Sequence, residues 1–222
     1  MFDLKNKFDY YLRSAAKFSR KNYSEDLNLT KEVNGYAFDI LSQTLRLEHQ
    51  KDLKVLDIGS KNWEYARGEY KFFRQYCENL VLDGVEIDAY RLYSNFYSRY
   101  EYAKFYIKDL AGVNYYPDDL LNIKGRYDYI IWILPFVTKY PLKRWGLPEK
   151  FFMPEKLLEH AYSLLKKDML IINQGEEEAE VQEQLFKKLK IPYKTLGEIK
   201  SKELEYRNRR FGFLVSRAVT AV

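Results

Sequence analysis

The stretch KVLDIGSKNW, residues 54–63, decides the fold because it joins an apolar run to a polar turn through one glycine. The apolar run predicts a buried strand, and Gly59 predicts that the chain then turns over Gly59–Asn62. In open α/β sheets, ligands bind beyond the carboxyl ends of the strands, so this turn is expected to form the floor of a ligand site. A dinucleotide site needs the pattern GxGxxG, because the pyrophosphate approaches backbone N–H groups closely. Only the first glycine is present, which favours a nucleoside ligand without phosphates.

On both sides of this stretch, short apolar runs alternate with amphipathic segments, as in βα units on a mostly parallel sheet. The predicted strands are Lys54–Ile58, Asn79–Ile87, Ala103–Lys108, Tyr127–Leu134, Met169–Asn173, Tyr193–Gly197 and Arg210–Arg217. The predicted helices between them are Ala89–Arg99, Pro154–Lys167 and Glu176–Lys190. The last two strands have no helix between them, so we expect a terminal antiparallel hairpin.

The predicted fold class is therefore α/β: a seven-stranded, Rossmann-like, mostly parallel sheet with helices on both faces. Residues 1–50 show helical spacing, with Thr30 as a candidate N-cap, and no strand pattern. We expect residues 1–50 to form a helical extension or lid and residues 51–222 to form the Rossmann-like domain.

Composition excludes several classes of protein. Among 222 residues, 46% are apolar and 31% are charged, which suits a folded domain rather than a disordered chain. No apolar stretch approaches the roughly 18–20 residues that a membrane span needs, and the N-terminus does not resemble a secretory signal. Cys77 is the single cysteine, so an internal disulfide is excluded and no metal site is expected. We expect a cytoplasmic protein without a membrane partner.

Acidic residues follow two further predicted strands. Glu86, with Ile87 beside it, ends the second strand, where a carboxylate can accept hydrogen bonds from both hydroxyls of a ribose. Asp109 ends the third predicted strand and could accept from the adenine amine, with Leu110 packing beside it. The alternatives are a solvated residue for Glu86 and a turn-initiating residue for Asp109.

In order and spacing, these motifs resemble those of the class I S-adenosylmethionine-dependent methyltransferases. The first motif is VLDIGSKN, the second GVEID, the third YIKDLAG and the fourth YDYIIWILPF, and SLLKKDMLIINQ precedes the fifth strand. The resemblance covers about residues 50–217 and implies S-adenosylmethionine as cofactor. It implies that the methionine end of the cofactor is held by Asp57, Gly59, Ser60 and Asn62. The family usually has further glycines where this chain has Lys61 and Trp63.

The segment after the fourth predicted strand, LPFVTKYPLKRWGLPEKFFMP, is too long and apolar for a simple loop and is expected to form the acceptor side. Its candidate substrate-binding residues are Pro135, Phe136 and Lys139. The ILPF motif lacks the Asn or Asp that would accept from the exocyclic amine of a base, so methylation of such amines is not assigned. No catalytic base is identified, and His49 and His160 are interpreted as structural or exposed.

Four functions remain to be compared. Methyl transfer to a small molecule is preferred, and the oligomeric state is left open. A nucleic-acid acceptor comes second, using the EYRNRR segment and the basic N-terminal residues Lys5, Lys7, Arg13, Lys17, Arg20 and Lys21; it predicts binding that weakens steeply with salt. A non-catalytic methyltransferase-like binding module, used for protein interaction, is supported only by the missing glycines. A nicotinamide-dependent oxidoreductase is last, because the phosphate-binding turn is absent.

Overall fold

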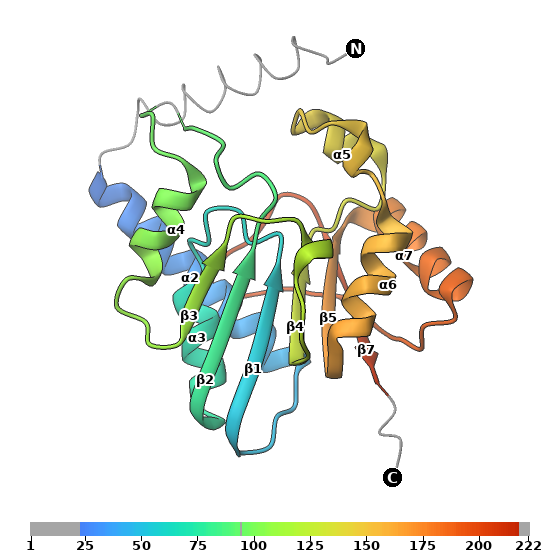
Figure 1. Cartoon of the computed structure of the whole chain (residues 1–222), viewed down its shortest axis with the longest axis horizontal. Coiled ribbons are helices and arrows are strands. Elements are labelled where there is room, and N and C mark those ends of the chain that lie inside the picture. Colours follow the sequence, from blue (N-terminus) through green and yellow to red (C-terminus); the bar gives the residue numbers. More distant parts are fainter. Residues whose placement is uncertain (1–22, 94, 218–222) are drawn as a thin grey trace.

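The computed structural model describes residues 23–93 and 95–217, which form one seven-stranded sheet of order β3-β2-β1-β4-β5-β7-β6 (Figure 1). Strands β1 to β5 are parallel, whereas β7 is antiparallel to both β5 and β6. The strands are β1 Gln50–Ile58, β2 Cys77–Val85, β3 Val113–Tyr116, β4 Tyr127–Ile133, β5 Leu165–Gln174, β6 Lys194–Glu198 and β7 Arg210–Ser216. The predicted fold class and terminal hairpin are confirmed.

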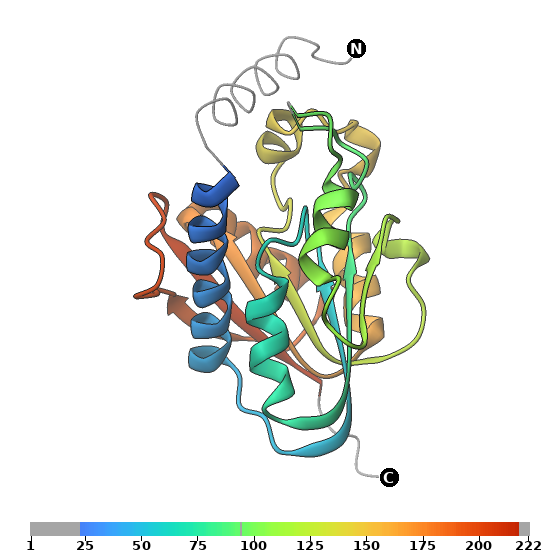
Figure 2. The ribbon, with the colours of Figure 1, turned by 90° about the vertical axis from the view of Figure 1, so that its left-hand side faces the viewer.

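Helices cover both faces of the sheet (Figure 2). One face carries α2 Tyr23–Thr44, α3 Ala66–Arg74 and α4 Arg99–Ile107. The other carries α6 Pro154–Leu164 and α7 Gly175–Leu189. Above the strand ends lie the short α5 Lys139–Arg144 and the 3₁₀ turn η2 Glu149–Phe151, while the 3₁₀ turn η1 Leu120–Asn122 packs against α6.

Strand β1 shows how the sheet divides the interior into two cores. Because successive side chains of a strand point to opposite faces, Leu53 and Val55 pack with α2 and α3, while Leu56 and Ile58 pack with α6 and α7. Asp57 lies two residues after Val55, so its side chain points to the same face of the sheet and its carboxyl group lies on the side of α2 and α3. The buried α2 residues Tyr36, Ile40, Leu41 and Leu45 belong to the same core.

The third strand lies further along the chain than the sequence predicted. Residues 103–108, predicted as a strand, mostly lie in helix α4. Of residues 89–99, predicted as a helix, 89–93 and 95–98 form irregular turns with one bridge between Leu92 and Ser98. Both predictions were wrong because aromatic residues recur at similar spacing throughout 89–107. A capping box decides the helix start: Ser98 Oγ accepts from Glu101 N (3.2 Å), and Ser98 N donates to Glu101 Oε2 (2.6 Å).

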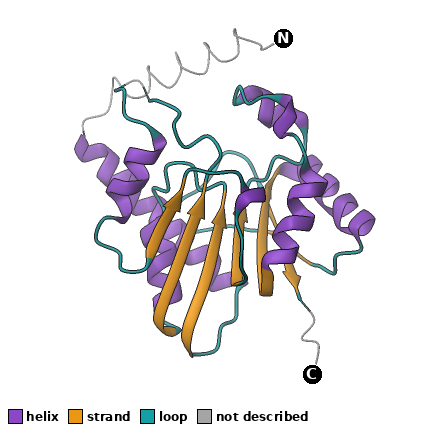
Figure 3. Cartoon of the chain, in the orientation of Figure 1, coloured by secondary structure: helices purple, strands orange, loops and turns teal. Residues whose placement is uncertain are grey.

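Loops run along the upper edge of the sheet, where the parallel strands end (Figure 3). No helix among residues 23–93 and 95–217 is both long and apolar enough to cross a bilayer. The basic N-terminal residues that the sequence analysis singled out, Lys5 to Lys21, lie outside the described residues.

Candidate active site

A cavity of ≈ 1270 Å³ opens at the carboxyl ends of β1, β2, β4 and β5. Its volume exceeds the ~300–1,000 Å³ that is usual for one small ligand, so it has room for two. One half is formed by the Gly59 turn, the end of β2 and the loop after β3. The other half is formed by the segment after β4 together with α6, α7 and β7. The first half includes Gly59, Lys61, Tyr65, Glu86, Ile87, Asp118 and Asp119.

The turn after β1 keeps a glycine-type backbone with a single glycine. Gly59, Lys61 and Trp63 have φ angles of 73°, 56° and 50°, in the left-handed region that side chains usually avoid. These are the positions at which the resembling family has its glycines. A Cβ placed on Gly59 would meet nothing within 4 Å, so the space above the turn is open. Lys61 and Trp63 therefore carry side chains in a backbone conformation that glycine adopts more easily.

The Trp63 indole does not fill this space. Its side chain is fully buried in the core on the α2–α3 side, and Trp63 is not among the residues that line the cavity. Its Nε1 donates to Glu69 Oε2 at 3.0 Å. The ring fits because β2 has Gly84 beside it, where a Cβ would lie 2.8 Å from the indole carbons. The cavity floor is thus free of this large side chain.

Two buried carboxyl groups, Asp57 and Glu69, lie beside the turn together with the half-buried Tyr65. Tyr65 OH donates to Asp57 Oδ2 at 2.9 Å, and the other oxygen, Asp57 Oδ1, has no partner among the described residues. Burial, followed by repulsion between the two carboxyl groups, raises the pKa of Glu69 well above its usual value. Burial likewise raises the pKa of Asp57. Asp57 itself does not line the cavity, whereas its partner Tyr65 does.

Glu86 lies at the predicted place, at the end of β2, and lines the cavity. Its Oε2 accepts from Lys61 N (2.9 Å) and its Oε1 accepts from Asp88 N (2.8 Å). The buried Arg99 guanidinium lies 3.7 Å from Glu86 Oε1 and 3.3 Å from Asp88 Oδ2. The carboxylate is therefore fixed between the turn and the rim. Ile87 follows on the cavity wall.

The predicted third acid does not join this group. Asp109 is exposed at the end of α4, where it pairs with Arg67 at 3.1 Å, and neither Asp109 nor Leu110 lines the cavity. Asp118 and Asp119 occupy the place after β3 instead, and both line the cavity. The signal that could have found them is YYPDD, residues 115–119, in which a proline ends a short strand directly before two acids.

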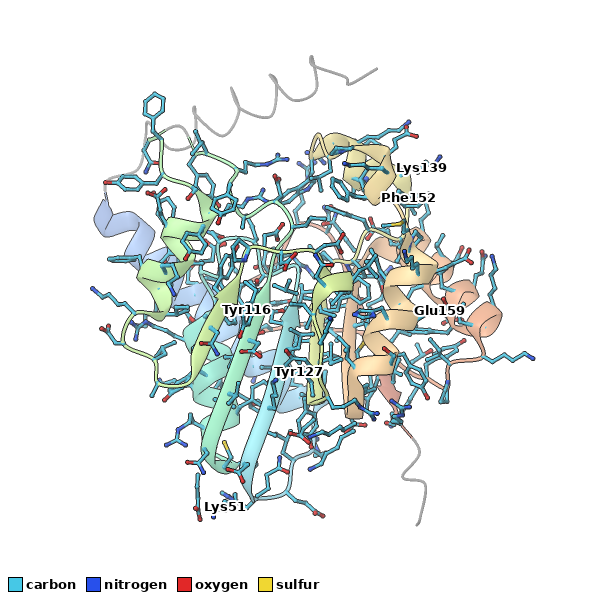
Figure 4. All side chains as sticks on the ribbon, in the orientation of Figure 1. Lys51, Tyr116, Tyr127, Lys139, Phe152 and Glu159 are labelled. Atoms are coloured by element: carbon cyan, nitrogen blue, oxygen red, sulfur yellow. The ribbon has the colours of Figure 1, made fainter. Side chains whose placement is uncertain are left out.

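The segment after β4, residues 134–154, lies above the strand ends and is called the cap. Pro135 and Phe136 line the cavity as predicted, but Lys139 does not. Lys139 Nζ lies 5.9 Å from the Phe152 ring centroid, and both residues lie above the sheet in Figure 4. Lys139 Nζ also lies 3.9 Å from Glu149 Oε2, so its charge is paired within the cap. The contacts of all these residues with a cofactor or an acceptor stay predictions.

Comparison with known proteins gives matches in structure only. No family model matches the sequence, and no curated protein matches it. A SAM-dependent methyltransferase from Aquifex aeolicus has a TM-score of 0.57 and 14% identity, covering 89% of this chain and 99% of that one. Magnesium protoporphyrin IX methyltransferase from Synechocystis PCC 6803 with bound SAH has a TM-score of 0.52 and 11% identity, covering 90% and 89%. The plantazolicin methyltransferase BpumL with SAH has a TM-score of 0.51 and 14% identity, covering 92% and 89%.

These likenesses span nearly the whole chain and share its sheet. The protein therefore has the fold of the class I S-adenosylmethionine-dependent methyltransferases, with the resemblance expected from its motifs.

Proposed function

We propose that this protein binds S-adenosylmethionine above the Gly59 turn and methylates a small-molecule acceptor held under the cap. The observation that carries the proposal is the turn itself: three left-handed residues, an open space above Gly59 and the Glu86 carboxylate beside it. A nucleoside with an amino-acid tail suits this site, because no phosphate has to approach the backbone.

The residues in and beside the Gly59 turn have the following roles in the proposal. Glu86 would accept from the ribose hydroxyls, with Ile87 beside it, and Asp118 or Asp119 would accept from the adenine amine. Gly59, Ser60 and Asn62 would lie against the methionine end. Neither Ser60 nor Asn62 lines the cavity, because both are buried beside Gly59. Asn62 Oδ1 has no partner among the described residues, so it would be the acceptor for the cofactor's ammonium group. Asp57 would act through Tyr65 as a positioning residue.

When bound, the cofactor supplies a methyl group on a sulfonium: the S–CH₃ bond breaks, the acceptor's lone pair forms the new bond, and the acceptor loses a proton to solvent. The protein's task is to align acceptor and methyl group and to exclude water; orientation alone supplies effective molarities of about 10⁵ M or more. The cap residues Pro135 and Phe136 are placed to do this.

A small molecule is favoured over nucleic acid by the charges of the EYRNRR segment. Arg209 lies within salt-bridge distance of Glu176 and 3.0 Å from Glu198, so its charge is paired within its own chain. Arg210 is buried, 3.7 Å from the Tyr206 ring centroid. Of the three arginines in this segment, only the exposed Arg207 has no ion pair or ring contact among the described residues, which is little charge for phosphates to bind.

Titration calorimetry with S-adenosylhomocysteine tests the proposal. We expect saturable binding of one ligand and a rise in melting temperature. Glu86→Gln is expected to weaken binding at least tenfold, because a charged acceptor is lost. Glu78→Gln, at an exposed residue of β2, is the matched control and should bind as the unaltered protein does. Absence of saturable binding at millimolar ligand would refute the proposal and leave the non-catalytic module and the oxidoreductase as alternatives.

A further inference from the structure

The half of the cavity under the cap has a polar wall on helix α7. Gln182 lines the cavity with only 2% of its surface exposed. Its Nε2 has no hydrogen-bond partner within the part of the chain that the structure describes. A buried donor without a partner lowers the free energy of unfolding by about 1–3 kcal/mol. Such a donor is unfavourable on a helix face that contacts only protein. The free donor therefore indicates a ligand atom that accepts from it.

The polar groups around Gln182 do not meet this need. Glu178, one helical turn earlier, accepts from Gln174 N at 3.1 Å, and burial raises the pKa of its carboxyl group. Asn173, at the end of β5, is fully buried, and neither of its amide atoms has a partner among the described residues. Two neutral amides thus lie unsatisfied where β5 leads into α7.

Apolar side chains form the rest of this half. The cap contributes Leu142, which is fully buried, and Val137, and α6 contributes Leu158. The remaining apolar lining residues on this side include Pro135, Phe136, Leu147, Phe151, Met153, Leu157 and Leu185. An occupant must therefore offer a mainly apolar surface.

Most charged side chains around this half of the cavity lie beside an opposite charge or an aromatic ring. Lys143 Nζ lies 3.0 Å from Glu149 Oε1, at the outer side of the cap. The Arg210 guanidinium lies 3.7 Å from the Tyr206 ring centroid and 5.7 Å from the Tyr36 ring centroid, and its charge acts on Glu178. Arg144 lines the cavity from an exposed position at the rim. Arg210 is the buried cation of this half, and its Nε has no hydrogen-bond partner among the described residues. An anionic acceptor would have to compete with Glu178 and the two rings for it, in a pocket that is otherwise mostly apolar.

We propose that the acceptor is an uncharged, mainly apolar small molecule whose carbonyl or hydroxyl oxygen accepts a hydrogen bond from Gln182 Nε2. That this ligand accepts a methyl group rests on the proposed function, whereas the binding site at Gln182 does not depend on it. Gln182 is thus a specificity residue, and it holds the apolar body of the ligand against the underside of the cap.

Three matched probes test the proposal by ligand-observed NMR titration, with and without S-adenosylhomocysteine. The probes are 2-acetylnaphthalene, which has a carbonyl acceptor, 2-ethylnaphthalene, which lacks it, and 2-naphthoate, which is anionic. We expect the ketone to bind about tenfold more tightly than the hydrocarbon or the carboxylate. Equal binding of ketone and hydrocarbon, tighter binding of the carboxylate, or no binding of the ketone would each overturn the proposal.

A matched pair of variants assigns the effect to one side chain. Gln182→Met keeps the side-chain length but removes the donor, and Gln184→Met makes the same change at an exposed position of α7. Gln182→Met should bring the ketone down to the affinity of the hydrocarbon, while Gln184→Met should change neither. If Gln182→Met does not fold, the ranking of the three probes on the unaltered protein still decides. The protein could bind the ketone through Gln182 and still fail to bind S-adenosylhomocysteine. That result would refute the proposed methyltransferase function and support the binding site at Gln182.

Discussion

Arg99 and Trp145 stack across the mouth of the cavity, with the guanidinium carbon 4.7 Å from the indole centroid. The same guanidinium lies 3.7 Å from Glu86 and 3.3 Å from Asp88. One buried arginine thus joins the cap, in which Trp145 follows α5, to the acid that would hold the ribose. A substitution that alters the contact between Arg99 and Trp145 is therefore expected to alter the contact between Arg99 and Glu86 as well.

Trp145→Leu is therefore expected to loosen the cap and to weaken S-adenosylhomocysteine binding about three- to tenfold, since a cation–π contact contributes about 0.5–2 kcal/mol. Amide hydrogen exchange over residues 139–153 should become faster. Tyr97→Leu, at a residue that is 57% exposed and does not line the cavity, is the control. Unchanged exchange in Trp145→Leu would contradict the link.

The acids after β3 give a second prediction. The double substitution Asp118→Asn with Asp119→Asn is expected to weaken S-adenosylhomocysteine binding about tenfold, because both residues line the cavity. Asn can still cap η1, so the local fold is kept. Asp109→Asn should leave the affinity unchanged, because Asp109 pairs with Arg67 at the surface. Titration calorimetry measures the affinities. A larger loss of affinity in Asp109→Asn than in the double variant would assign the cofactor contact to Asp109 instead.

The buried Glu69 gives a prediction on pH. Because burial raises its pKa in the folded state, the folded protein binds more protons than the unfolded chain from about pH 4 upward. The free energy of unfolding should therefore fall as the pH rises through this window, by up to about 1.4 kcal/mol per pH unit for each proton. In Glu69→Gln, which keeps an oxygen for the Trp63 indole, the fall should be shallower. Urea unfolding between about pH 5 and 8 measures it, with Glu78→Gln as the control. Parallel curves for Glu69→Gln and the unaltered protein would contradict the prediction.

Gly84 gives a prediction on packing. Gly84→Ala should lower the free energy of unfolding by about 1–3 kcal/mol, because its Cβ would lie 2.8 Å from the Trp63 ring carbons. In a Trp63→Phe background the same substitution should cost less, since the smaller ring leaves room. Denaturant unfolding of the four proteins completes the cycle. An equal cost in both backgrounds would show that the two residues do not interact.

Much of the fold could be predicted because its strands are buried. All but one of the predicted strands overlap observed ones, since apolar runs such as residues 129–133 leave little choice of structure. The terminal hairpin followed from the missing helix before β7. Glu86 also lies at the predicted strand end, because the second strand was correctly placed.

The region between β2 and β3 could not be predicted in the same way. Its many tyrosines and phenylalanines suit a helix, a strand or an exposed loop equally well, and Phe96 is in fact 83% exposed. The misplaced third strand then led to Asp109 rather than to Asp118 and Asp119. Gln182 was missed because a polar residue on an amphipathic helix gives no sign in the sequence that it faces a cavity.

Trp63 and Gly84 carry one further consequence, for the ancestry of the chain. A lineage that gains a side chain at residue 84 while it keeps the indole at residue 63 loses stability, because both groups need the same volume. A lineage that regains a small residue at 63 leaves a hollow that a larger residue at 84 can fill. Descendants of one ancestor should thus separate into two groups, each inheriting these two positions as a pair.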